Sequence, residues 1–217
     1  MLSRSEKQLL SICDTIVADA YFSQESFVSG AISLGFNIIS RFRDDVNLKY
    51  IYRDPKTGKK GRPQKFVGKV NPAELDMNVF REEASTDDNQ TYKLYTADVW
   101  AVSLGREVRV VIVDYIDTDK KRQTRKVFFC TDLTKSAKDI FDIYRTRFQL
   151  EFVYRDGKQF MGLTHCQVRN KEAMSFAFNA SLSSVNVARA YARKEGYNLL
   201  VGATKNPDAQ CFNAGSI

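Results

Sequence analysis

The sequence has a single histidine, His165, among its 217 residues, and its four cysteines lie far apart. No Cys-x2-Cys pair is present, so the spacing of a zinc finger or zinc ribbon is missing. We therefore expect the cysteines to be reduced and structural. With one histidine, a Ser-His or Cys-His mechanism is also disfavoured. Any catalysis in this chain must depend on carboxylates.

Long apolar runs are missing as well. No stretch reaches the roughly 18 consecutive apolar residues that a membrane helix needs. The first ten residues, MLSRSEKQLL, lack the apolar region of a signal peptide. A hydrophobic content of 43% is enough to bury one core. These features predict a cytoplasmic protein without a membrane span.

Positive charge is concentrated in one segment. The net charge is +7, and residues 41–70 hold ten basic side chains against three acidic ones, so this segment alone accounts for the excess. Such concentration favours contact with a polyanion over general solubility, although a solvated basic loop is the alternative. Within it, Gly61-Arg62-Pro63 resembles the core of an AT-hook, which lies in the minor groove of DNA. The candidate DNA-contacting residues here are Lys59, Lys60, Arg62 and Lys65.

Three regions follow one another along the chain. Residues 1–43 read as helix, strand, helix, strand, which favours a parallel pair of strands. The first strand, residues 15–18, ends at Asp19, and Gly35 ends the second helix. Residues 44–133 are rich in β-formers, with a hairpin around Gly105, and residues 71–90 are expected to be an exposed connection.

Residues 134–217 are predicted to be helical. One helix is expected to run from about residue 135 to residue 156, with Gly157 as the first break, and another covers residues 171–194. In the first of these helices, Tyr144, Arg147, Glu151 and Lys158 fall within roughly 60° of arc, with Arg155 close by. A carboxylate among cations and a phenol suits a site that handles both a metal and phosphate. The alternative is a solvated helix face with an Arg147–Glu151 pair.

The spacing Tyr-x2-Arg-x3-Glu-x6-Lys resembles the YREK motif of bacterial insertion-sequence DDE transposases. The surrounding run IYRTRFQLEFVYRDGKQFMGLTHCQVR resembles the glutamate region of that family. Upstream, IVADAYFSQESFVSGAISLGFNIISRFRDD resembles its second-aspartate region, and the stretch GKKGRPQKFVGKV has a similar place in relatives. The resemblance covers essentially the full chain.

This resemblance implies an α/β fold with an RNase H-like core, interrupted by a β-rich insertion and followed by C-terminal helices. It implies that Asp19 and Glu151 are catalytic and bind two divalent ions, Mg²⁺ or Mn²⁺, for DNA strand cleavage and strand transfer at transposon ends. Tyr144, Arg147 and Lys158 match positions that contact the DNA, and Arg155 lies beside them. The implied partners are double-stranded DNA and a second copy in a synaptic dimer, in a bacterial cytoplasm close to the nucleoid.

One departure from the family concerns the first aspartate, which belongs on a strand upstream of the second. Asp14 does not fit, because it lies beside the strand that delivers Asp19. We therefore expect a C-terminal portion that lacks the first core strands and is catalytically incomplete. The alternative function is that of a non-catalytic product that binds DNA or a partner and inhibits full-length transposase.

Trp100 leaves two interpretations open. On its strand it alternates with Asp98 and Val102, which favours a packed or half-packed ring. Stacking on an unpaired base is the alternative.

Overall fold

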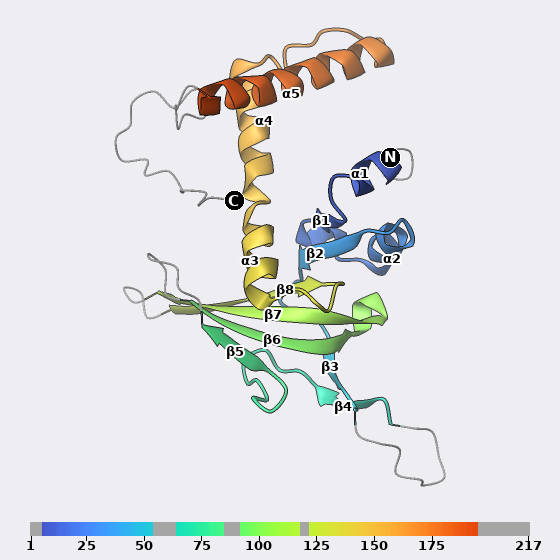
Figure 1. Ribbon diagram of the computed structural model, residues 1–217, viewed down its shortest axis with the longest axis vertical. Helices are drawn as coiled ribbons and strands as arrows, with labels where there is room; N and C mark the ends of the chain where they lie inside the picture. Colours follow the sequence, from blue (N-terminus) through green and yellow to red (C-terminus); the bar gives the residue numbers. More distant parts are fainter. Residues whose placement is uncertain (1–5, 54–63, 85–91, 118–121, 195–217) are drawn as a thin grey trace. The chain divides into compact units, whose positions relative to one another are not determined.

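The computed structural model describes residues 6–53, 64–84, 92–117 and 122–194 (Figure 1). The chain divides into two compact units, Met1–Arg147 and Phe148–Ile217, called unit 1 and unit 2 below. The division predicted at residues 43–44 and 133–134 stays a prediction. None of the helices in these ranges is both long and apolar enough to cross a membrane.

Unit 1 opens with two strands that pair in parallel. The elements in order are α1 (Glu6–Leu10), β1 (Thr15–Val17), the 3-10 helix η2 (Ala20–Phe22), α2 (Glu25–Ser33) and β2 (Asn37–Arg41). Val17 of β1 lies opposite Ile39 of β2. Gly35 has a φ of 86°, a left-handed conformation that glycine adopts without strain, so the chain turns directly from α2 into β2. The predicted element order and the parallel pairing are confirmed.

The later strands extend the same sheet. They are β3 (Leu48–Ile51), β4 (Phe66–Lys69), β5 (Arg81–Ala84), β6 (Tyr92–Ala101), β7 (Arg106–Asp117) and β8 (Arg122–Cys130). The strand order is β1-β2-β8-β7-β6-β3-β4, with β5 paired to β6, and every pair among the described strands except β1–β2 is antiparallel. The predicted hairpin is confirmed, since β6 and β7 are joined through Val102–Leu104 and Gly105.

The expectation that residues 71–90 form only an exposed connection was wrong. Strand β5 pairs with β6, and Phe80 is buried. The backbone ladder and the Glu82–Lys93 ion pair, at 3.1 Å, hold this strand in place. It carries no alternating apolar side chains, so its sequence gives no strand signal.

Apolar side chains cover both faces of the sheet. Val110 and Val111, neighbours on β7, belong to different core clusters, as alternation along a strand requires. One cluster includes residues of α2, and the other includes residues of α3 (Ala137–Arg145). Tyr144 of α3 packs on Phe128 of β8, with 4.7 Å between ring centroids. The last turn of α3 is therefore held against the sheet.

The predicted single helix over residues 135–156 was wrong, because the helix is interrupted at Thr146 and Arg147. The Thr146 hydroxyl donates to the carbonyl of Ile143 at 2.6 Å, and the Arg147 amide donates to the carbonyl of Tyr144 at 3.0 Å. These contacts reach back three residues and close a tight final turn, which ends the helix without a glycine or proline. The four motif residues therefore do not share one uninterrupted helix.

Unit 2 contains α4 (Phe148–Phe160) and α5 (Lys171–Lys194), and α5 was predicted correctly. Gly157 is not a break but a buried residue within α4. A Cβ atom there would lie 3.3 Å from Cδ2 of Leu163, so glycine permits close packing. The neighbouring Asp156 is fully buried and accepts hydrogen bonds from Arg155 and from Arg189 of α5. This buried ion pair fastens α5 to α4.

A second buried carboxylate stabilises the sheet of unit 1. Asp114 is 2% exposed, and Arg125 donates to both of its carboxylate oxygens through Nε and Nη2. The Nη1 group of Arg125 also donates to the carbonyl of Pro72. Only the carboxylate of this pair is fully buried, since the Arg125 side chain is 26% exposed, so the pair matters mainly through the hydrogen bonds that Asp114 receives in the interior.

We predict that Arg125→Met lowers the free energy of unfolding by about 1.5–3 kcal/mol, because the buried Asp114 carboxylate loses both hydrogen bonds from Arg125. Urea denaturation of the purified chain measures this loss. The matched control is Arg53→Met, since the Arg53 side chain is 61% exposed where it pairs with Glu107. That pair is worth about 1 kcal/mol or less. Equal losses for the two variants would contradict the assignment.

Candidate active site

Asp19 lies just beyond the carboxyl end of β1, with its side chain exposed. Its backbone is fixed by the neighbouring strand: the Ala18 amide donates to the carbonyl of Ile39 at 3.0 Å, and the buried Ser40 hydroxyl donates to the carbonyl of Asp19 at 3.1 Å. The carboxylate makes no capping hydrogen bond to η2, which it precedes. β2 therefore holds the residue while its carboxylate faces solvent.

Tyr144, the first residue of the motif, lies within electrostatic reach of Asp19. Burial raises the pKa of the Tyr144 phenol above its ordinary value, and the Asp19 carboxylate raises this pKa further. The charges of Arg147 and Arg41 lower the same pKa, and Arg147 adds a hydrogen bond. The Arg147 guanidinium carbon is 5.9 Å from the centroid of the Tyr144 ring. Unit 1 thus gathers Asp19, Tyr144 and Arg147, which were assigned from sequence.

Three residues beside Asp19, Tyr144 and Arg147 were not assigned to the site from sequence: Arg41, Tyr115 and Arg145. Burial raises the pKa of Tyr115, while the charges of Arg145 and Arg41 lower it. Arg145 also lies over the Phe141 ring, at 5.6 Å from its centroid. For Arg41 a signal was present, since the alternation of β2 places residue 41 on the same face as Ile39, which packs in the cluster under α3. Nothing comparable pointed to Tyr115 or Arg145.

The two remaining motif residues, Glu151 and Lys158, belong to unit 2, as does Arg155. Glu151, Arg155 and Lys158 are exposed on α4. Arg155 donates to Asp156 and covers the Phe152 ring at 5.0 Å, while Nζ of Lys158 is 5.8 Å from the Tyr154 ring. α4 therefore presents the carboxylate and one cation of the motif on its surface, together with the neighbouring Arg155.

Of the basic residues predicted to contact DNA, Lys65 is described and exposed, next to the start of β4. Lys59, Lys60 and Arg62 lie outside the described residues. Trp100 of β6 is partly buried against Phe66 of β4, with ring centroids 5.7 Å apart, and Nζ of Lys49 on β3 is 5.1 Å from the Phe66 ring. The packing interpretation of Trp100 agrees with this contact.

Cysteine chemistry has no support in the described residues. Cys13, Cys130 and Cys166 are free thiols. Burial raises the pKa of Cys130 to about 11, so this thiol stays protonated at neutral pH. The described ranges also contain no group of three or more His, Cys, Asp or Glu side chains able to hold a metal. Asp19 and Glu151, the two carboxylates assigned from the family motif, are both exposed and lie in separate units.

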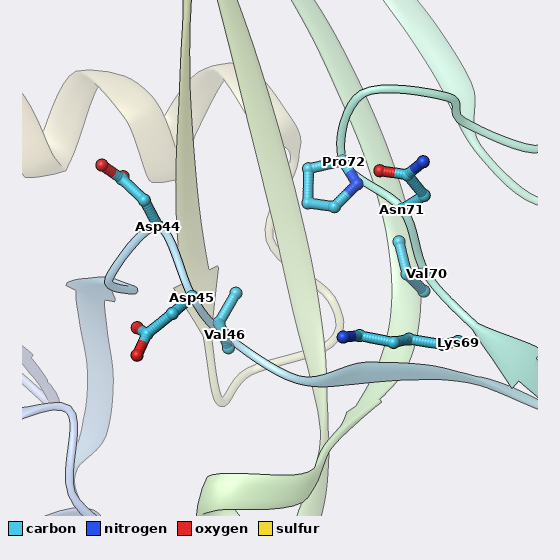
Figure 2. Close-up of a pocket in the computed structure, with 7 residues that line it drawn as sticks. All are labelled: Asp44, Asp45, Val46, Lys69, Val70, Asn71 and Pro72. Atoms are coloured by element: carbon cyan, nitrogen blue, oxygen red, sulfur yellow. The ribbon is translucent and has the colours of Figure 1, made fainter.

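A pocket of about 350 Å³ lies beside the connection from β2 to β3 (Figure 2). It is lined by two groups of residues, 44–46 and 69–72. None of the predicted site residues lines it. Its rim, however, includes Asp44, whose carboxylate accepts a hydrogen bond from Nη2 of Arg41 at 3.2 Å.

The family model of the transposase DDE domain matches residues 7–187 of this chain. The chain belongs to that family. The match includes Asp19 and all four motif residues, and it extends over both units. A comparison with curated proteins finds no match.

Membership of the DDE transposase family supports a transposase function and places the chain in the nuclease and transferase class. It implies a DNA substrate. Family members generally use divalent metals, and carboxylates such as those of Asp19 and Glu151 are the hard oxygen donors that Mg²⁺ prefers. The chemistry of this donor set therefore fits the metal that the family implies.

We predict that Asp19→Asn lowers the pKa of Tyr144, because the substitution removes a negative charge that disfavours the phenolate. A pH titration by NMR of tyrosine labelled at the ring carbon that bears the hydroxyl follows this pKa, and Tyr144→Phe identifies its resonance. Asp14→Asn is the matched control, since Asp14 precedes β1 at the opposite end of the strand. An unchanged Tyr144 titration in Asp19→Asn would show that the two groups are not neighbours.

Proposed function

We propose that this chain is a cut-and-paste DDE transposase with an RNase H-like core, in which Asp19 and Glu151 are the second aspartate and the glutamate of the catalytic triad. The observation that carries the proposal is the position of Tyr144. A motif residue more than 100 positions from Asp19 in sequence packs against the sheet within reach of that carboxylate. Chance resemblance to a motif gives no reason for this proximity.

The metal would be held by the carboxylates of Asp19 and Glu151. Bound divalent ions supply activation of the attacking water or 3′-hydroxyl and stabilisation of the leaving oxygen. The exposure of Asp19 supports this role, since its carboxylate is committed to no cap.

The cations of the motif would hold the DNA backbone. Arg147 and Lys158 carry donors suited to phosphate oxygens, and the Tyr144 phenol can donate one hydrogen bond. Arg155 would have a smaller share in this, because Asp156 already accepts from its Nε and Nη2. The basic residues Lys59, Lys60, Arg62 and Lys65 would contact the duplex outside the reaction centre, in a synaptic complex that contains a second copy.

No residue of this sequence is proposed as the first aspartate of the triad. Asp14 lies before β1, where its carbonyl accepts from Asn37 and its carboxylate accepts from the Thr15 hydroxyl. Among the described strands, β1 pairs with β2 alone, so a further parallel strand can bind its other edge. An RNase H-like core carries its first aspartate on such a strand. Because no residue is assigned as the first aspartate, a second candidate function is inhibition of full-length transposase by a non-catalytic chain.

We predict weak Mn²⁺ binding that Asp19→Asn and Glu151→Gln each weaken further, since each substitution removes one oxygen ligand of the ion. Electron paramagnetic resonance of free Mn²⁺ measures the binding. Glu172→Gln, on the exposed first turn of α5, is the control that should have no effect. Binding that is insensitive to both Asp19→Asn and Glu151→Gln would remove these residues from the metal site.

In Mg²⁺, nicking of supercoiled plasmid by this chain alone should be negligible, because a third carboxylate is needed to complete the site. Strong nicking that Glu151→Ala abolishes would contradict this expectation and would keep the enzyme class. Slower cleavage by a full-length relative in the presence of this chain would favour the inhibitory function.

We also predict that the chain binds duplex DNA without metal. Replacement of Lys59, Lys60, Arg62 and Lys65 by Ala should weaken binding and flatten the slope of log K against log salt by up to about one unit per lost phosphate contact. Fluorescence anisotropy over a salt series measures both quantities. The matched control removes four exposed lysines from the helices: Lys7, Lys138, Lys171 and Lys194. The same slope change in both variants would mean that the segment acts only through net charge.

A further inference from the structure

Arg41 ends β2 and has a guanidinium group with few partners. Its side chain is 31% exposed, and Nη2 donates to the Asp44 carboxylate at 3.2 Å. Its Nε is buried and has no hydrogen-bond partner among the described residues. An arginine has five donors, so most of the capacity of this group is uncommitted within the described structure.

Arg41 and the candidate catalytic residue Asp19 lie at the carboxyl ends of neighbouring parallel strands, in which Val17 pairs with Ile39. Ser40, the residue before Arg41, donates to the backbone of Asp19 at 3.1 Å. The Tyr144 phenol responds to both charges, since Asp19 raises its pKa and Arg41 lowers it. Arg41 is therefore on the side of the sheet where the motif begins.

Stabilisation of the fold does not explain the placement of Arg41. Two arginines with a structural role in this sheet, Arg109 and Arg125, each donate twice to one carboxylate and once to a backbone carbonyl. Arg41 has neither feature, and the side chain of Asp44 is 77% exposed. An exposed ion pair of this kind adds little to stability.

We propose that Arg41 binds a DNA phosphate beside Asp19, and that the carboxylate of Asp44 occupies its guanidinium group when DNA is absent. The guanidinium group of arginine donates hydrogen bonds to a phosphate in the same geometry as to a carboxylate. A DNA phosphate and the Asp44 carboxylate therefore compete for the guanidinium group of Arg41. The inference rests on the proposed function and adds to it a contact and its regulation. Because Asp44 occupies the guanidinium group of Arg41, it lowers the affinity for DNA by more than its negative charge alone would.

Asp45 provides a built-in comparison. Figure 2 shows the Asp44 and Asp45 side chains pointing in different directions from adjacent positions. Both side chains are exposed, and within the described residues Asp45 has no ion pair. Replacement of either residue by Asn removes one negative charge at nearly the same place, but only Asp44→Asn frees Arg41.

The experiment measures anisotropy of a labelled 20-base-pair duplex of arbitrary sequence, in EDTA and over a salt series. Arg41→Ala should weaken binding about 5- to 10-fold at 0.1 M salt and make the salt slope shallower by about one unit, as the loss of one phosphate contact requires. Asp44→Asn should tighten binding roughly 1.5- to 5-fold, the range that corresponds to an exposed ion pair. Asp45→Asn should tighten it less. With Arg41→Ala in place, the extra gain of Asp44→Asn over Asp45→Asn should vanish.

An unchanged affinity and slope in Arg41→Ala, with wild-type binding intact, would overturn the inference and leave the proposed function standing. Equal gains from Asp44→Asn and Asp45→Asn would refute the competition by Asp44. No binding of the duplex by the wild-type chain at low salt would overturn both proposals. If thermal melting shows that Arg41→Ala is unfolded, Arg41→Gln replaces it, and the comparison of Asp44→Asn with Asp45→Asn stands by itself.

Discussion

The pairing of β2 with two different neighbours is the constraint on which the candidate site depends. On one side β2 pairs in parallel with β1, and on the other it pairs antiparallel with β8. Ile38 and Ile39 of β2 pack in the apolar clusters on the two faces of the sheet. Ser40 fixes the backbone of Asp19, and Arg41 lies on the side of Tyr144. A shift of β2 by one residue would turn all of these side chains to the opposite face.

The sequence predicted those elements whose signals are local. The strand that ends before Asp19, the glycine after α2 and the hairpin around Gly105 all follow from apolar runs and turn residues within a few positions. Helix α5 was equally clear. The family motif then identified Asp19 and Glu151 as the carboxylates of interest, and their roles remain proposals.

What the sequence could not predict depends on contacts between distant residues or on unusual local bonding. β5 is held by its ladder with β6 and by an ion pair, so no alternation marks it. The apolar pattern continues across Thr146, whereas the helix ends there in a tight turn, with hydrogen bonds from Thr146 to Ile143 and from the Arg147 amide to Tyr144. The alternation of β2 indicates which face Arg41 lies on, but not that Tyr144 of α3, more than 100 positions later, lies within reach of its charge. Single-sequence patterns do not contain that pairing.

The pairing of β2 with β8 closes a much longer stretch of chain than the hairpin of β7 and β8 does. Ile39 pairs with Cys130, 91 positions away, whereas Tyr115 pairs with Thr124, 9 positions away. By the logarithmic dependence of loop closure on length, the longer loop costs about 2 kcal/mol more chain entropy than the hairpin. The pairing of β6, β7 and β8 must offset that loss of chain entropy, because β2 pairs with β8. The position of Asp19 thus depends thermodynamically on a pairing that closes a stretch of 91 positions, far from Asp19 in the sequence.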